Sequence, residues 1–169
     1  MIYLFKMLYP QNKNFEMDIA IKDSQTLWDL HIAIKNKLNF KSEEPASFLL
    51  VSEKNWSIKK EYPAINFENP NEEPLIKKIT IADVVGRKKQ KLLYLFDMFS
   101  ERYFVLNFVS TTEEEKTLKY PLFFNEKGNP PTQTFYDLEL DTNSKDDLDD
   151  DEFGFNDDDM YGYDENDLY

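Results

Sequence analysis

Two apolar runs near the middle of the chain are the strongest signal in its pattern of hydrophobic and polar positions. Residues 91–99 and 103–110 are rich in Val, Leu, Phe and Tyr, and a short polar Ser-Glu-Arg stretch separates them. Such runs are typical of the two strands of a hairpin that is buried on both faces. Because a strand that is apolar on both sides needs cover on both sides, we expect the other elements to pack around this hairpin.

The spacing of apolar residues also predicts the elements that precede this hairpin in the sequence. Residues 2–9 form an apolar and aromatic run, and residues 15–22 alternate between apolar and polar, so the two predict an opening hairpin. A helix is expected from Thr26, whose hydroxyl can cap the first turn while Asp29 reaches back to the cap. Apolar residues then recur on one helical face as far as Leu38.

Shorter elements are expected between the helix and the central hairpin. Residues 46–52 predict a strand and residues 56–58 an edge strand, whereas the three prolines in residues 61–74 predict a loop. A short helical turn is expected at residues 81–85. The order predicts an α+β fold in which one main helix packs on a mixed sheet, related to the β-grasp, or ubiquitin-like, arrangement.

The acidic charge of the chain is concentrated near its C-terminal end. Residues 141–169 hold 13 of the 33 acidic residues and one Lys, so they carry −12 of the net charge of −13 and leave residues 1–140 nearly neutral. This division predicts one globular domain over residues 1–140 and an acidic, aromatic tail over residues 141–169.

Composition narrows the classes of function. The sequence has no cysteine, which excludes thiolate metal sites and cysteine nucleophiles, and it has one histidine. Only Gly86 and Gly128 lie within residues 1–140, so glycine-rich phosphate loops are absent. No signal peptide or membrane span is visible, which favours a cytoplasmic protein. We therefore expect a non-enzymatic protein that needs no cofactor and no metal.

Four short segments, in this order, resemble the motifs of one known family. They are TLWDLHIAI at 26–34, TIAD at 80–83, LYLFD at 93–97, and a Tyr-Pro at 120–121 that precedes Gly-Asn-Pro-Pro at 128–131. The chain resembles the plasmid pRiA ORF-3-like family over roughly residues 1–135. The resemblance implies a bacterial domain of largely unknown biochemical role, often encoded on plasmids or near mobile elements, with some members labelled as transposon passenger proteins.

The sequence departs from this family pattern after the central strand. Relatives usually have a tight acidic turn of the form Asp-Phe/Tyr-Gly-Asp-Asp/Glu-Trp, whereas residues 97–103 read DMFSERY. The turn glycine and one acidic residue are missing here. If that turn carries an activity in relatives, we expect this chain to have lost it.

An alternative hypothesis is a mobile-element enzyme or nucleic-acid-related protein with a site around His31, Asp97 and Glu101. The two carboxylates could form an acid/base pair or hold a cation. Each residue also has a structural interpretation, which we prefer. His31 lies in the apolar stripe of the predicted helix, Asp97 ends a strand and Glu101 lies in a turn.

Two charged segments are candidates for interaction. One is the basic run of Arg87, Lys88, Lys89 and Lys91, which could contact phosphates. Because the acidic tail would repel a duplex, direct binding to nucleic acid is not expected. The other is the tail itself, in which aromatic rings stand among carboxylates: Asp149, Asp150, Asp151, Phe153, Asp157, Asp158, Asp159 and Tyr161.

Such a tail could bind or shield a basic protein surface, or dock on residues 87–91 of its own chain. The main hypothesis is therefore a non-enzymatic interaction module whose acidic tail engages a basic protein partner. The sequence does not set its oligomeric state.

Overall fold

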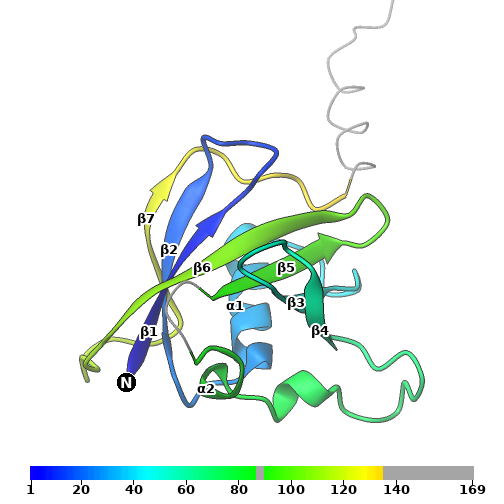
Figure 1. The fold of residues 1–169 in the computed structure, drawn as a ribbon, viewed down its shortest axis with the longest axis horizontal. Helices are drawn as coiled ribbons and strands as arrows, with labels where there is room; N and C mark the ends of the chain where they lie inside the picture. Colours follow the sequence, from blue (N-terminus) through cyan, green and yellow to red (C-terminus); the bar gives the residue numbers. More distant parts are fainter. Residues whose placement is uncertain (87–89, 135–169) are drawn as a thin grey trace, which may run out of the picture.

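The computed structural model of the chain describes residues 1–86 and 90–134 and places one main helix on a seven-stranded sheet (Figure 1). The strand order is β4-β3-β5-β6-β1-β2-β7, which makes the fold α+β. In chain order the elements are β1 (Ile2–Leu8), β2 (Glu16–Lys22), α1 (Leu27–Leu38), β3 (Ser47–Val51), β4 (Ile58–Pro63), the 3-10 helix η1 (Leu75–Lys77), α2 (Ile81–Val84), β5 (Lys91–Asp97), β6 (Arg102–Thr112) and β7 (Leu122–Lys127).

The strand pairings in the described residues are all antiparallel, so the prediction of a mixed sheet is wrong. The physical reason lies in the central hairpin. Its second strand, β6, lies between β5 and β1 and is antiparallel to both. β5 therefore runs in the same direction as β1 but does not pair with it. A β-grasp sheet needs a parallel neighbour for its first strand, so the finer β-grasp assignment is not confirmed.

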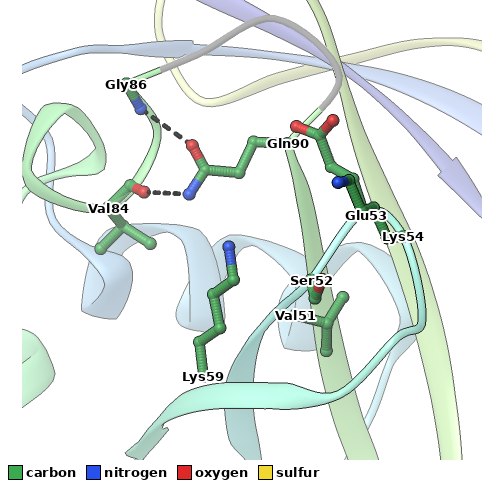
Figure 2. A pocket seen from close by; sticks show the side chains of 8 residues that line it. All are labelled: Val51, Ser52, Glu53, Lys54, Lys59, Val84, Gly86 and Gln90. Atoms are coloured by element: carbon green, nitrogen blue, oxygen red, sulfur yellow. Dashed lines mark hydrogen bonds between the residues drawn. The ribbon is translucent and has the colours of Figure 1, made fainter.

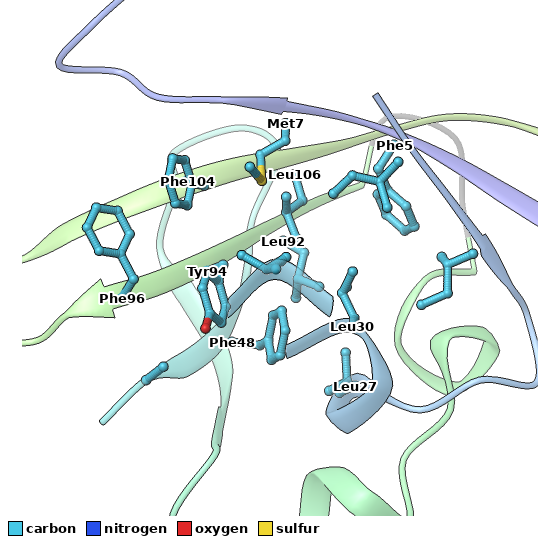
Figure 3. Close-up of a cluster of buried hydrophobic side chains, with 14 of the residues drawn as sticks. Phe5, Met7, Leu27, Leu30, Phe48, Leu92, Tyr94, Phe96, Phe104 and Leu106 are labelled. Carbon is cyan, nitrogen blue, oxygen red and sulfur yellow. The ribbon is translucent and has the colours of Figure 1, made fainter. Parts of the chain in front are cut away.

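The hairpin of β5 and β6 is buried on both faces, as its two apolar runs predict. On the face toward α1, Tyr94 and Phe104 belong to the main hydrophobic core, part of which is shown in Figure 3. On the outer face, Leu93 packs in a smaller cluster with Leu49 and Val105. The alternation along the strands directs successive side chains to opposite faces.

The helix α1 begins where the sequence predicts. Thr26 is its N-cap, and its hydroxyl accepts a hydrogen bond from the Asp29 backbone N–H at 3.1 Å. The Asp29 carboxylate accepts from the Thr26 N–H at 2.7 Å and completes the capping box. The helix ends at Asn39, which adopts the left-handed conformation with φ of 54°. Its apolar face packs on the sheet.

Both edge strands differ from the predictions. β4 runs from Ile58 to Pro63, so it starts where the predicted edge strand ends and enters the segment expected to be a loop. A proline is tolerated there because β4 lies at the sheet edge. β7 was not predicted, and it pairs with β2. Within residues 1–86 and 90–134, no helix has the length and apolar character to cross a membrane.

Candidate functional site

His31 lies in the core and is bound to a residue of the central hairpin. Its Nδ1 atom is 2.9 Å from the Tyr94 hydroxyl, and its ring packs 5.3 Å from that of Trp28. Burial, with a smaller contribution from the Lys35 ammonium, lowers the pKa of His31 to about 4. Burial also raises the pKa of Tyr94. The pair is therefore neutral at neutral pH, and it joins α1 to β5.

Asp97 forms a buried ion pair with Arg102. Its Oδ2 atom accepts hydrogen bonds from the arginine Nε at 2.9 Å and lies 2.8 Å from an arginine terminal nitrogen. The Ser100 backbone N–H donates to the other carboxylate oxygen at 3.1 Å. Burial acts to raise the pKa of Asp97, but the hydrogen bonds from Ser100 and Arg102 outweigh it and leave that pKa lowered. The carboxylate is thus ionised and fully engaged.

Arg102 also fixes a distant segment of the chain. Its terminal nitrogens donate to the carbonyl oxygens of Thr132 at 3.1 Å and Gln133 at 2.7 Å. The Gln133 side-chain amide in turn bonds both the N–H and the carbonyl of Lys41, just after α1. Sequence reasoning missed Arg102 and Gln133, because a buried arginine has no local pattern that distinguishes it from an exposed one.

The three residues of the alternative site do not come together as a catalytic group in the described structure. His31 bonds Tyr94, whereas Asp97 bonds Ser100 and Arg102. Glu101 is exposed in the turn between β5 and β6, where its φ is 51°. In the parts of the chain that the structure describes, no three His, Cys, Asp or Glu side chains form a group that could hold a metal ion.

A hollow of about 580 Å³ lies beside α2 and the turn that joins β3 to β4 (Figure 2). Figure 2 shows the Lys59 amino group pointing into it, and Lys54 also lines it. Gln90 braces one wall, because its side-chain amide accepts from the Gly86 N–H at 3.1 Å and donates to the Val84 carbonyl at 2.9 Å. The hollow is therefore polar, and its lining includes Lys54, Lys59 and the oppositely charged Glu53.

The lining of the hollow includes Gly86 and Gln90, the described residues on either side of most of the predicted basic run in the sequence. Gly86 and Gln90 flank residues 87–89, and Arg87, Lys88 and Lys89 lie outside the described residues. Lys91 is described, and its ammonium nitrogen lies 4.0 Å from the centre of the Trp56 ring. That contact is a cation–π interaction. The candidate tail residues from Asp149 to Tyr161 also lie outside the described residues.

The comparisons with known proteins identify the family. The sequence model of the family of plasmid pRiA4b ORF-3-like proteins matches residues 10–139 of this chain. The chain belongs to this family. A solved structure of a protein of unknown function from Methanosarcina mazei Go1 is similar, with a TM-score of 0.61 and 17% identity over 86% of this chain and 82% of that chain. At that identity the likeness shows the fold alone. No curated protein matches the sequence.

In this pRiA4b ORF-3-like protein, the motif residues occupy structural positions. Thr26 caps α1, and Thr80 caps α2 with the same kind of capping box. Gly128, from the last motif, has φ of 72° and lies against the Asn14 backbone. Tyr94, in the LYLFD motif, holds His31 of the first motif. These motif residues therefore have roles in holding the fold together.

Proposed function

We propose that this pRiA4b ORF-3-like protein is a non-enzymatic interaction module that binds a basic surface of a partner protein. The observation that carries the proposal is the division of charge, with −12 in residues 141–169 beside a nearly neutral remainder. Concentrated negative charge attracts positive patches and speeds association with them. Binding to a basic protein surface is the simplest use of such a segment.

The ionisable side chains of the core support a binding role over a catalytic one. His31, Asp97 and Arg102 are buried, and each bonds other parts of the fold. Lys35 is buried too, and its ammonium donates to the carbonyl oxygens of Ser42 at 2.9 Å and Glu44 at 2.8 Å. A catalytic acid or base must reach a substrate proton, and side chains that are buried and already bonded within the fold favour a structural role instead.

Aromatic rings give the tail more than charge. Residues 141–169 contain five large rings set among the carboxylates: Phe153, Phe155, Tyr161, Tyr163 and Tyr169. Attraction between exposed charges alone is screened by salt. Rings add apolar contact area that salt does not screen, so they would make binding selective for basic surfaces that also offer apolar contacts.

The proposal is tested with the full-length chain and a variant in which Asp149, Asp150, Asp151, Asp157, Asp158 and Asp159 become Asn. Both are titrated onto purified basic proteins at rising salt. We expect the parent chain to bind more tightly by about tenfold or more at low salt, with the difference shrinking as salt rises. A second variant, with Phe153 and Tyr161 replaced by Ser, tests the rings. Equal binding by all three proteins would contradict the proposal.

A further inference from the structure

A groove of about 240 Å³ on the outer face of the sheet, opposite α1, combines an apolar floor with an acidic rim. The floor crosses three neighbouring strands, where Leu4 of β1 pairs with Ala20 of β2, and Ala20 pairs with Leu122 of β7. Phe5 belongs to the core on the α1 side and Tyr3 packs against that core, so Leu4, which lies between them in β1, faces outward. The floor is thus part of the sheet itself.

One wall of the groove is the loop between β6 and β7, and hydrogen bonds fix it. The Gln25 side-chain amide donates to the Tyr120 carbonyl at 2.9 Å, and the Glu115 N–H donates to the Tyr120 hydroxyl at 3.3 Å. The Leu118 N–H donates to the Glu115 carbonyl at 3.1 Å. The wall therefore has a defined shape before any partner binds, which lowers the entropic cost of binding.

Large apolar side chains at the groove are open to solvent. Leu118 is 41% exposed and Phe124 is 37% exposed, and both line the groove. Covering such side chains is favourable at about 25 cal/mol per Å² of apolar surface. A partner that covers Leu118 and Phe124 would therefore gain stability from these contacts.

Both charged residues in the lining of the groove are acidic. They are Glu113 and Glu115, and in the described chain neither carboxylate is in an ion pair, whereas the neighbouring Glu114 pairs with Lys22. Lys116 and Lys119 lie in the same loop but do not line the groove. The Glu115 carboxylate also accepts a hydrogen bond from the Thr117 hydroxyl at 2.9 Å. The two carboxylates thus complement a Lys or Arg on an extended segment that covers the apolar floor.

The backbone beside the groove offers a further point of attachment. β7 is the last strand in the sheet order, so its outer edge has no neighbouring strand in residues 1–86 and 90–134. Such an edge pairs readily with an extended segment of another chain. A strand added there would lie next to Leu122 and Phe124.

From these observations we propose that the groove receives an extended segment of the partner protein, with apolar residues at its centre and Lys or Arg beside them. The apolar side chains cover Leu118, Leu122 and Phe124, and the cations meet Glu113 and Glu115. This inference rests on the proposed function, because it supplies a defined docking site for the same basic partner. It places specificity in the domain, while the tail supplies long-range attraction.

The test uses the full-length chain and a fluorescent heptapeptide with a Leu-Val-Leu centre flanked by Lys pairs. Its two controls carry Ser-Thr-Ser at the centre or Glu in the flanks. We expect Phe124→Asp, and separately Leu118→Asp, to weaken binding of the Lys-flanked apolar peptide by about tenfold or more. Phe67→Asp is the matched control, because Phe67 is 60% exposed and lies far along the chain in the segment before η1; it should bind normally.

Each outcome decides the proposal. The double variant Glu113→Gln, Glu115→Gln should bind several-fold more weakly, with a smaller dependence on salt. The groove proposal is contradicted if the parent chain binds the Ser-centred peptide as tightly as the apolar one. It is also contradicted if both groove variants bind the apolar peptide as tightly as the parent chain. Neither result would contradict the function proposed for the tail. No measurable binding by the parent chain would overturn the groove proposal too. A self-association in sedimentation that Phe124→Asp abolishes would show instead that a second copy of the chain occupies the groove.

The two proposals fail separately. The tail variant with six Asn residues should retain the difference between the parent groove and Phe124→Asp, because the groove lies in the described domain. If the tail variant loses all peptide binding while the groove variants bind normally, the function stands and the groove proposal falls. Thermal melting of every variant shows that the fold is intact.

Discussion

Thr26 and Thr80 form an isolated antiparallel β-bridge, which brings the starts of α1 and α2 together. The Leu27 N–H donates to the Ile79 carbonyl at 2.9 Å beside this bridge. Each threonine also caps its own helix, and in both cases the hydroxyl accepts from a backbone N–H three residues later. Two motifs that are 54 positions apart in the sequence therefore form one structural unit.

Removal of either cap should destabilise the domain. We expect Thr26→Ala and Thr80→Ala each to lower the free energy of unfolding by about 1 kcal/mol, measured by urea titration, because a helix N-terminus loses its side-chain acceptor. Thr111→Ala is the control, since Thr111 is exposed in β6, and it should change stability by less than about 0.5 kcal/mol. Equal effects of all three substitutions would show that the caps contribute nothing particular.

His31 should make stability depend on pH between roughly 6.5 and 4. Its pKa falls from 6.5 to about 4 in the fold, so in this window the unfolded chain binds a proton that the folded chain does not. The contribution of His31 to the free energy of unfolding is therefore complete above about pH 6.5 and is lost as the pH falls toward 4. Relative to His31→Gln, which cannot titrate, the parent chain should lose about 2–3 kcal/mol more between pH 7 and pH 4.5.

The variant Tyr94→Phe distinguishes the effect of burial on the pKa of His31 from the effect of the hydrogen bond to Tyr94. Burial is the largest cause of the lowered pKa, so this variant should keep the pH dependence although it loses the hydrogen bond. The parent chain and both variants contain the same carboxylates. The effect of carboxylate titration on stability therefore cancels when the three proteins are compared. The same pH dependence in the parent and in His31→Gln would refute this account of the histidine.

The ion pair of Asp97 and Arg102 should behave as a coupled unit. Arg102→Met leaves a buried carboxylate without its cation and frees two carbonyls, so we expect a loss of about 3–5 kcal/mol. Adding Asp97→Asn should recover part of that loss, with a coupling energy of about 1–3 kcal/mol in a double-mutant cycle. Additive effects would mean that the two side chains act independently.

Hydrogen exchange gives a second readout of this pair. The Lys41 amide is bound to the Gln133 side chain, which Arg102 holds in place through the Gln133 carbonyl. In Arg102→Met, protection of the Lys41 amide should fall more than protection of amides in β1.

Two glycines provide a matched pair of substitutions. A Cβ atom at Gly128, where φ is 72°, would lie 2.3 Å from the Asn14 carbonyl oxygen, whereas one at Gly86 would meet nothing within 4 Å. Gly128→Ala should therefore lower stability by more than about 1 kcal/mol, and Gly86→Ala should leave it unchanged or raise it slightly. The ranking of the two melting temperatures decides this, and the reverse order would be inconsistent with the packing at Gly128.

The helix and the central hairpin could be predicted from the sequence because short-range interactions determine them. The Thr26 cap and the apolar face of α1 are visible within a few turns of one helix. β7 could not be predicted in the same way, since its polar residues are held by the neighbouring strand β2, which lies far away in the sequence. The Lys127 ammonium nitrogen lies 2.6 Å from a Glu16 carboxylate oxygen, and the Asn125 side-chain amide donates to the Asp18 carboxylate at 2.8 Å.

The candidate site shows the same division. A structural role for His31 follows from its place in the helix stripe, but the sequence does not show that its partner is Tyr94, which lies 63 residues away. The groove could not be predicted either, because its lining comes from four strands and a loop. The position of β6 beside β1 explains why the predicted mixed sheet was wrong.

The most direct test of the central claim is quantitative co-purification from the cells that encode the protein. The full-length chain is compared with the variant in which the six tail aspartates from Asp149 to Asp159 become Asn, and the enriched proteins are identified by mass spectrometry. The account predicts at least one basic partner that the parent chain enriches and the variant does not, with enrichment that falls as salt rises. Equal enrichment by both chains, or partners that are uniformly acidic, would contradict it.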